Sequence, residues 1–270
     1  MKQCKDEVIA VVEVNESVAS IRRPFEYPAK FVGIDSYLKY RSRYCRPILV
    51  LTESPHIDEF NVRNVTDFSS GQAVSARPVN GVTGDNIMLK LVDLLKATKV
   101  TLSDGYYPVI VMNALQEQCS EGDRDTGKYR TRNFIRLWNK KQSYLEERLR
   151  EVDPTIVFCS CTVGDFNLAN GTNAYSEGSR KIFENHFRKL LESEFGLAPS
   201  TNNSPYSFLG SLDLSGLVAN VVFRIFDNRN SYLFKTTHPS SWLRRPPNLN
   251  GLNTQVSFKF EHNKQFKSDS

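Results

Sequence analysis

Three polar side chains with the chemistry for catalysis each follow, or end, a short apolar run. Glu53 follows the first run (PILVLT), Asn113 ends the second (PVIVMN), and His238 follows the last (SYLFKTT). A carboxylate can stabilise a developing positive charge, an imidazole can stabilise a leaving anion, and an amide can hydrogen-bond the polar edge of a ring. The three residues are far apart in the chain, so the fold has to bring them together.

Four short apolar runs rich in β-branched residues predict the strands that carry these side chains. The first three are nearly continuous rather than alternating, which is typical of strands covered on both faces of a parallel sheet. Ligands bind such sheets at the carboxyl ends of the strands, so the carboxylate, the amide and the imidazole are expected on one rim. The four runs are residues 47–52, 108–113, 155–160 and 231–237.

Segments with helical spacing of apolar residues lie between these runs and predict covering helices. The alternation of strands and helices favours an α/β fold, a three-layer α/β/α sandwich around a central, mostly parallel, four-stranded sheet. The helical segments are residues 85–98, 131–152 and 179–195.

The remaining segments are less regular. An expected short strand (8–14) and an expected helix (35–44) belong to an N-terminal extension of about residues 1–45. Residues 218–226 are expected to form a hairpin with the last strand, at the end of an insertion of about 198–230. No interdomain linker stands out, so we expect a single domain over the whole chain.

Composition narrows the classes of function. The chain has 270 residues, of which 40% are hydrophobic and 24% are charged. No apolar run approaches the ~18 residues of a membrane span. The amino-terminal sequence lacks the apolar core and cleavage site of a secretory signal, so a cytoplasmic location is expected. The five cysteines are odd in number and include no CxxC pair, which argues against a disulfide framework or a zinc site.

The positive charge is concentrated towards the carboxyl terminus. The formal net charge is +5, and residues 224–270 alone carry eight lysines and arginines against three acids. The rest of the chain is therefore neutral. A basic segment on a neutral body favours an anionic polymer as partner, although basic tails also serve solubility.

An ordered set of three short motifs adds to this interpretation. Residues 52–55 (TESP) follow the first strand, residues 77–84 (RPVNGVTG) precede a helix, and residues 238–243 (HPSSWL) follow the last strand. The set resembles the motifs of the uracil-DNA glycosylase superfamily. There the first motif has a GEAP form, the thermostable branch has RPFVGxAG, and the second motif is HPSPLS. The resemblance spans about residues 47–243.

This resemblance implies a monofunctional DNA glycosylase, which flips a pyrimidine-type base out of DNA, hydrolyses its N-glycosidic bond and leaves an abasic site. It implies DNA as the partner. The iron–sulfur cysteines of the thermostable branch are absent, so no cluster is expected. We also expect no other metal or organic cofactor, no membrane, and a monomer with no obligate protein partner. Glu53 would stabilise the sugar cation and orient water, and His238 would stabilise the leaving base at its O2. Asn113 would bind the Watson–Crick edge of the base.

Departures from the family motifs bear on which base would be bound. Thr52 replaces a glycine, His56 replaces the tyrosine with which uracil-specific members exclude a methyl group, and Val79 replaces a phenylalanine that stacks on the base. A smaller side chain at the position that stacks on the base implies a wider pocket. A wider pocket favours a modified or bulky cytosine of phage DNA as the base, and such a substrate would imply a role in antiviral defence. Phe60 or Phe68 could instead supply the stack, and uracil repair would then be favoured. The expected pocket residues are Ser54, Pro55, His56, Phe68, Val79 and Asn113.

The segment after the imidazole is expected to meet DNA. Trp242 stands where the family has an intercalating leucine and is the first candidate wedge for the gap left by the flipped nucleotide, with Leu243 second. Packing inside the protein is the alternative for Trp242. The expected DNA contacts, which include phosphate-binding arginines, are Ser240, Ser241, Trp242, Leu243, Arg244 and Arg245. Further basic residues, either solvated or in contact with DNA, are Arg124, Lys128, Arg130 and Arg132.

Two other classes of function remain open. One is a nucleic-acid-binding member of the family without turnover, which would keep the pocket. The other is an α/β hydrolase acting on a small nucleoside or ester. The sequence contains no GxSxG, P-loop or HExxH motif that would support the hydrolase.

Overall fold

The structure is a computed structural model that describes the central sheet and most of the helices around it. The described residues are 3–24, 33–56, 59–60, 78–79, 81–119, 127–164, 185, 187–189, 192, 213–245 and 247–252, and the side chains are described for all of these except 127–129.

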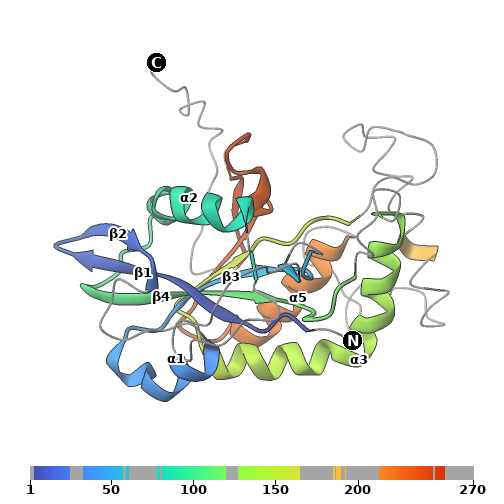
Figure 1. Cartoon of the computed structure of the whole chain (residues 1–270), viewed down its shortest axis with the longest axis horizontal. Coiled ribbons are helices and arrows are strands. Elements are labelled where there is room, and N and C mark those ends of the chain that lie inside the picture. The colour runs from blue at the N-terminus through green and yellow to red at the C-terminus, as the bar shows by residue number, and fades with distance from the viewer. Residues whose placement is uncertain are drawn as a thin grey trace.

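A seven-stranded mixed sheet forms the centre of the molecule (Figure 1). Its strands are β1 (Glu7–Asn15), β2 (Val18–Arg22), β3 (Ile48–Thr52), β4 (Gly105–Asn113), β5 (Ile156–Cys159), β6 (Tyr232–Thr236) and β7 (Leu249–Gly251). They lie in the order β2-β1-β4-β3-β5-β6-β7. The central strands β4, β3, β5 and β6 are parallel, and β1, β2 and β7 add to the two sides in antiparallel pairings. The α/β class is as expected, but the expected sheet of four strands is wrong.

Helices cover both faces of this sheet (Figure 1). The helix α2 (Val82–Thr98) packs on one face, and α1 (Ile34–Tyr40), α3 (Gly127–Val152) and α5 (Leu214–Phe226) pack on the other. The buried side chains form one apolar core on each face. This burial on both faces explains why the central strands are nearly continuous apolar runs.

The segment 218–226, expected to be a strand of a hairpin, is instead part of the helix α5. The Asp213 side chain caps this helix by accepting a hydrogen bond from the Gly216 backbone N–H at 2.8 Å. Most of its residues are buried, and it contacts α3, β5 and β6. Parallel strands cannot be joined by a tight hairpin, so the chain between β5 and β6 needs a crossover, and α5 is part of it.

The other expected elements are found with small shifts of their ends. The strand expected at 8–14 is β1, and the helix expected at 35–44 is α1, followed by a 3-10 turn at Arg41–Arg43. Much of the helix expected at 179–195 lies outside the described residues, although residues 185, 187–189 and 192 are helical. The short strands β2 and β7 carry no strong apolar pattern and were not expected.

The strand register places the carboxyl ends of the central strands level with one another. Thr52 pairs with Asn113, and Cys159 pairs with Lys235. We call the side of the sheet where the four central strands end, at Thr52, Asn113, Cys159 and Thr236, the carboxyl edge, which lies to the right in Figure 1. The opposite side, where these strands begin, is the amino edge.

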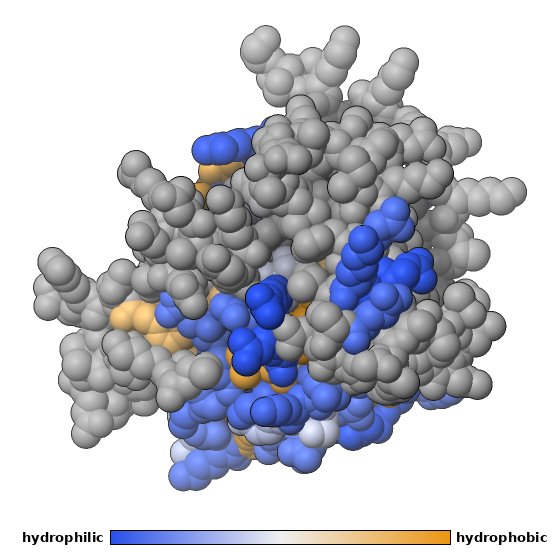
Figure 2. Space-filling view, turned by 90° about the vertical axis from the view of Figure 1, so that its right-hand side faces the viewer, coloured by the Kyte–Doolittle hydropathy of each residue, from blue (hydrophilic) through white to orange (hydrophobic). Residues whose placement is uncertain are grey.

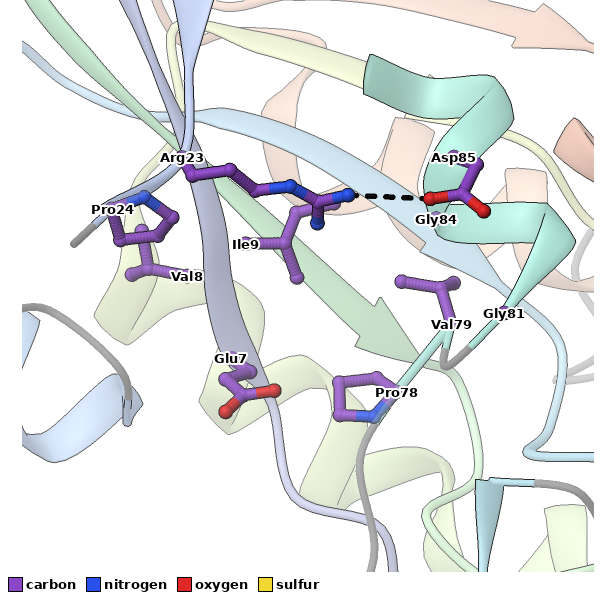
Figure 3. A pocket seen from close by; sticks show the side chains of 10 residues that line it. All are labelled: Glu7, Val8, Ile9, Arg23, Pro24, Pro78, Val79, Gly81, Gly84 and Asp85. Atoms are coloured by element: carbon purple, nitrogen blue, oxygen red, sulfur yellow. Dashed lines mark hydrogen bonds and ion pairs between the residues drawn. The ribbon is translucent and has the colours of Figure 1, made fainter. Parts of the chain in front are cut away.

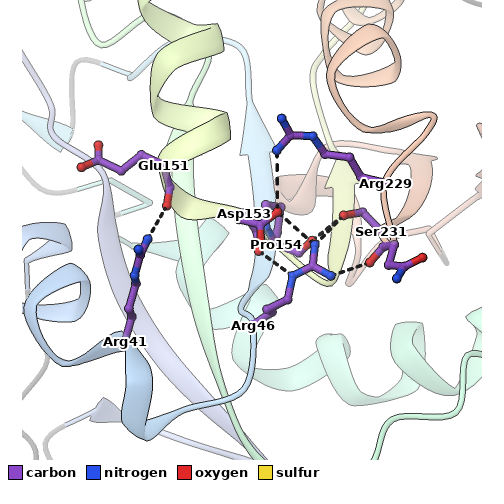
Figure 4. A network of polar contacts seen from close by, with 8 residues as sticks. Arg41, Arg46, Glu151, Asp153, Pro154, Arg229 and Ser231 are labelled. Carbon is purple, nitrogen blue, oxygen red and sulfur yellow. Dashed lines mark hydrogen bonds and ion pairs between the residues drawn. The ribbon is translucent and has the colours of Figure 1, made fainter.

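Arg46 closes the amino edge with a network of hydrogen bonds (Figure 4). Its guanidinium donates to the carbonyls of Asp153 at 3.1 Å and Pro154 at 3.0 Å. It also donates to the Asn230 carbonyl at 2.7 Å and the Ser231 hydroxyl at 2.9 Å. An ion pair with the Asp153 carboxylate at 3.1 Å adds to these bonds. The network ties the start of β3 to the turns that lead into β5 and β6.

Candidate active site

Glu53, the first residue after β3, is a fully buried carboxylate at the carboxyl edge. Its carboxylate forms an ion pair with Arg130 from the first turn of α3. The backbone N–H of Thr162, which follows β5, donates to Oε2 at 3.0 Å. An isolated buried carboxylate would be costly, so these two partners are what allow a charged group at this depth.

Asn113, the last residue of β4, lies beside the end of β3 and is also buried. The Thr52 hydroxyl donates to Oδ1 of Asn113 at 2.6 Å, a distance typical of an O–H donor. The other end of the amide, Nδ2, has no hydrogen-bond partner among the described residues. Thr52 therefore orients the amide so that a buried N–H donor remains available.

A buried ion pair holds the backbone that carries this amide. Arg148 of α3 donates from Nη2 to the carbonyls of Asn113 and Ala114, each at 3.0 Å. Its Nη1 contacts both carboxylate oxygens of Asp6, at 2.7 and 2.9 Å, and Gln116 donates to the same carboxylate at 3.2 Å. The N-terminal segment thus helps to position the end of β4.

His238 follows the end of β6 and is held as a neutral donor. Its Nδ1 accepts a hydrogen bond from the Ser240 backbone N–H at 3.3 Å, so the proton of the neutral ring lies on Nε2. The ring keeps some exposed surface but lies deep among protein atoms. Burial, followed by the charges of Arg130 and His56, lowers the pKa of His238 to about 3. The imidazole is therefore neutral at pH 7, with an N–H to donate.

The structure brings the three polar side chains expected from the sequence to the same edge of the sheet. Asn113 is paired in register with the residue before Glu53. Arg130 links the other two, because it pairs with Glu53 and its charge also acts on His238. A carboxylate, an amide donor and a neutral imidazole thus gather at the carboxyl edge.

Buried polar atoms without a protein partner accompany this group. Native proteins contain few such atoms, because each one carries an uncompensated cost of desolvation. Five side chains at or shortly after the ends of the central strands each have one such atom. The atoms are Ser54 Oγ, Asn113 Nδ2, Thr162 Oγ1, Thr236 Oγ1 and Thr237 Oγ1. Further buried atoms without a hydrogen-bond partner among the described residues include Asn86 Oδ1 on α2 and Trp138 Nε1 on α3.

The remaining residues of the first motif lie next to this group. Ser54 and Pro55 are buried, whereas His56 is exposed and its charge acts on His238. Phe60 is buried, and Phe68 lies outside the described residues. Figure 2 faces the carboxyl edge, and the described residues visible there are mostly hydrophilic, with small hydrophobic areas among them.

Val79 lines a pocket of about 420 Å³ at the start of α2, and none of Glu53, Asn113 and His238 is among its lining residues (Figure 3). The lining comes from β1, the end of β2 and the turn before α2, and includes an exposed ion pair between Arg23 and Asp85 at 3.3 Å. Val79 has a φ of 50°, which is strained for a β-branched residue. Its backbone N–H donates to the Glu59 carboxylate at 2.8 Å, and a Cβ on Gly84 would meet its carbonyl oxygen at 2.5 Å. Only glycine therefore fits at position 84.

The structure argues against Trp242 as a DNA wedge. Only 2% of this side chain is exposed, and it packs in the apolar core on the α2 face. Its indole N–H donates to the Thr237 carbonyl at 2.8 Å. Leu243, the second candidate, is 57% exposed. The expected contacts Ser240, Arg244 and Arg245 are exposed, and Ser241 is half-buried.

Sequence reasoning missed the two arginines that support the site. Arg130 was expected either to contact DNA or to be solvated, and it is instead the partner of Glu53. Arg148 and Asp6 were not singled out. Asp6 precedes β1 and Arg148 lies on the buried side of α3, and no local pattern in the sequence signals that they pair.

Comparison of the chain with protein-family models, with curated proteins and with solved structures finds no match. Among the described residues, no helix is long and apolar enough to cross a membrane. The same residues contain no cluster of histidine, cysteine and acidic side chains suited to a metal ion.

Proposed function

We propose that the protein is a monofunctional DNA glycosylase that hydrolyses the N-glycosidic bond of a flipped pyrimidine-type nucleotide. The observation that carries this proposal is the gathering of Glu53, Asn113 and neutral His238 at the carboxyl edge of one sheet. The resemblance of residues 52–55 and 238–243 to glycosylase motifs points the same way.

The chemistry of the reaction matches these groups. The bond between C1′ and the base nitrogen breaks, the electron pair leaves with the base, and the sugar gains positive charge. The buried carboxylate of Glu53 would stabilise that cation and orient a water molecule, whose hydroxyl adds to C1′ while its proton goes to the base. The Nε2–H of His238 would donate to O2 of the departing base, and Nδ2 of Asn113 would donate to the edge of the ring.

Binding to DNA would involve the turn that follows His238. A target inside a duplex has to leave the stack to reach a site at the end of a sheet. Leu243 is exposed on this turn and would fill the gap, in place of Trp242. Arg244, also exposed, would contact a phosphate.

The base we propose is a modified or bulky cytosine of phage DNA, which would make the protein an antiviral enzyme; uracil excision in repair is the alternative. The proposal rests on Val79, an aliphatic residue at the position where the related motif has an aromatic one, and on His56 in place of a tyrosine. In the related motifs both positions face the base, whereas here Val79 lines the pocket at the start of α2 and His56 is exposed, so the argument for this base rests on the motif comparison.

The test is excision from labelled oligonucleotides that carry either one uracil or one glucosylated hydroxymethylcytosine, with abasic sites revealed by alkaline cleavage. Glu53→Gln should lower abasic-site formation by about 100-fold or more while binding persists, as expected for a group that acts in the transition state. Glu147→Gln, which removes an exposed carboxylate from α3, is the matched control. DNA binding without any abasic site would instead indicate a silent nucleic-acid-binding protein. Release of uracil alone would refute the modified-cytosine substrate.

A further inference from the structure

We propose that Arg130 is the positioning residue of this site, with one guanidinium that fixes the Glu53 carboxylate and sets a permanent positive charge at the edge where His238 also lies. The inference rests on the proposed function for its biological meaning. The effects of Arg130 on the pKa values of Glu53 and His238 can be measured without substrate.

The two side chains of the Glu53–Arg130 ion pair differ in burial. The Glu53 side chain is fully buried, whereas the Arg130 side chain is 22% exposed. Arg130 comes from the first turn of α3, so a partly exposed guanidinium reaches the buried carboxylate from the side of the helix. The opposite oxygen of the carboxylate is held by the Thr162 N–H. The carboxylate is thus fixed from two elements, α3 and the segment after β5.

The charge of Arg130 reaches other groups at the carboxyl edge. It lowers the pKa of His238, together with burial and the charge of His56. It also opposes the rise that burial causes in the pKa of the Cys161 thiol, to which Asp213 contributes. Its charge thus acts on Glu53, His238 and Cys161. His56 also acts on His238, and Cys159, Lys235 and Asp213 also act on Cys161.

A single cation in this place serves two opposite needs of bond cleavage. The residue near the sugar has to be an anion, and the residue near the leaving base has to be a neutral donor. A positive charge favours the ionised form of a carboxyl beside it and the neutral form of an imidazole that its field reaches. Arginine suits the role because it stays charged at any relevant pH, and its planar fork holds a carboxylate in a fixed orientation.

The experiment is a pair of NMR titrations on the full chain, one of glutamate carboxyl carbons and one of histidine ring carbons, in the wild type and in Arg130→Gln. The Glu53 resonance is assigned by its loss in Glu53→Gln. Loss of the guanidinium should raise the pKa of the Glu53 carboxyl by about 1–3 units, the range expected for removal of an adjacent opposite charge. The pKa of His238 should rise in the same variant. The acid side of the excision pH profile should move upward with Glu53.

Two further variants keep the test decisive. Arg136→Gln removes the same charge from an exposed position on α3, and both titrations should stay at their wild-type values. Arg130→Lys retains the charge without the planar fork, so it should leave His238 unprotonated at pH 7. It should raise the pKa of Glu53 less than Arg130→Gln does. This variant replaces Arg130→Gln in the test if Arg130→Gln does not fold. Titrations that do not move in Arg130→Gln, or a shift of only one of the two groups, would overturn the proposal. Absence of glycosylase activity in the wild type would refute the proposed function but leave these titrations valid.

Discussion

The two edges of the same four parallel strands are built on opposite principles. At the amino edge, Arg46 donates to a set of carbonyls and a hydroxyl and pairs with Asp153, so the turns before β3, β5 and β6 are tied together. At the carboxyl edge, buried polar atoms near the ends of the central strands lack a hydrogen-bond partner among the described residues, among them Asn113 Nδ2 and Ser54 Oγ. Among the described residues, one edge pairs its polar groups within the chain, and the other leaves several buried donors and acceptors without a partner.

This difference separates stability from function within one sheet. A hydrogen bond made inside the protein contributes about 1 kcal/mol net, whereas a buried polar group left without a partner costs about 1–3 kcal/mol. Polar groups at the carboxyl edge thus reduce stability in the unliganded protein. We expect substitutions at the amino edge to lower stability alone, and substitutions at the carboxyl edge to affect activity, in some cases with a gain in stability.

The largest expected effect comes from a pair that departs from this division. Asp6 and Arg148 lie at the carboxyl edge but are paired, and burial raises the pKa of Asp6 while the charge of Arg148 opposes the rise. Asp6→Asn should lower the free energy of unfolding by about 3–5 kcal/mol, because it leaves the Arg148 charge buried without a counter-charge. Urea denaturation measures the loss. Asp104→Asn, an exposed carboxylate that accepts one long bond of 3.5 Å, is the control and should change little. Equal losses of unfolding free energy in the two variants would mean that the buried Asp6–Arg148 pair stabilises the fold no more than an exposed carboxylate does.

The next effect tests the amino edge. Arg46→Met should lower the free energy of unfolding by about 3 kcal/mol, because the variant loses several hydrogen bonds and leaves carbonyls without a donor. Arg41→Met should cost far less, since Arg41 makes one exposed bond of 3.4 Å to the Glu151 carbonyl. Thermal unfolding measures both. The distinction between the edges predicts that Arg46→Met leaves the ligand affinity of the folded protein unchanged; a loss of affinity at a temperature where the variant is folded would contradict it.

The fold could be predicted where burial on both faces left a clear pattern in the sequence. The continuous apolar runs identify β3, β4 and β5, and the helical stripe at 85–98 identifies α2. The run 218–226 was mistaken for a strand because a short, continuous apolar run rich in β-branched residues fits a buried helix equally well. The sheet is wider than expected because β2 and β7 pair with longer strands. The sequences of these short segments contain no apolar pattern that would predict this pairing.

Only the candidate site residues that lie at or just after strand ends could be predicted from the sequence. Glu53, Asn113 and His238 follow from the rule that ligands bind at the carboxyl ends of parallel strands. Arg130 was not predictable as a partner of Glu53, because their pairing depends on how the first turn of α3 is placed over the sheet. Trp242 was assigned by analogy with a motif, and the packing against α2 that buries it is a tertiary effect.

A smaller effect concerns pH and tests the neutral state of His238. The pKa of this ring is about 3 in the folded protein, against an ordinary value of 6.5. Between these values the unfolded chain binds a proton that the folded protein does not, so His238 makes stability rise with pH in this window. Its contribution is present above pH 6.5 and is lost as pH falls towards 3. His238→Gln should flatten the dependence by at most about 1.4 kcal/mol per pH unit, measured by urea denaturation from pH 4 to 7. An unchanged slope would mean that the imidazole is not held neutral.

The smallest effect isolates the cost of one atom at the carboxyl edge. The Thr236 hydroxyl is buried without a hydrogen-bond partner in the part of the chain that the structure describes. The Thr98 hydroxyl at the end of α2, by contrast, donates to the Leu95 carbonyl at 2.6 Å and accepts from the Val100 N–H at 3.1 Å. Thr236→Val keeps the shape of the side chain and should raise the free energy of unfolding by about 1 kcal/mol. Thr98→Val should lower it by about 1 kcal/mol, because it removes two hydrogen bonds. If both variants lose stability, the Thr236 hydroxyl has a partner within the folded chain, and the carboxyl edge is then less different from the amino edge than the structure indicates. If Thr236→Val gains stability and binds its ligand more weakly, the unpaired hydroxyl is retained for binding.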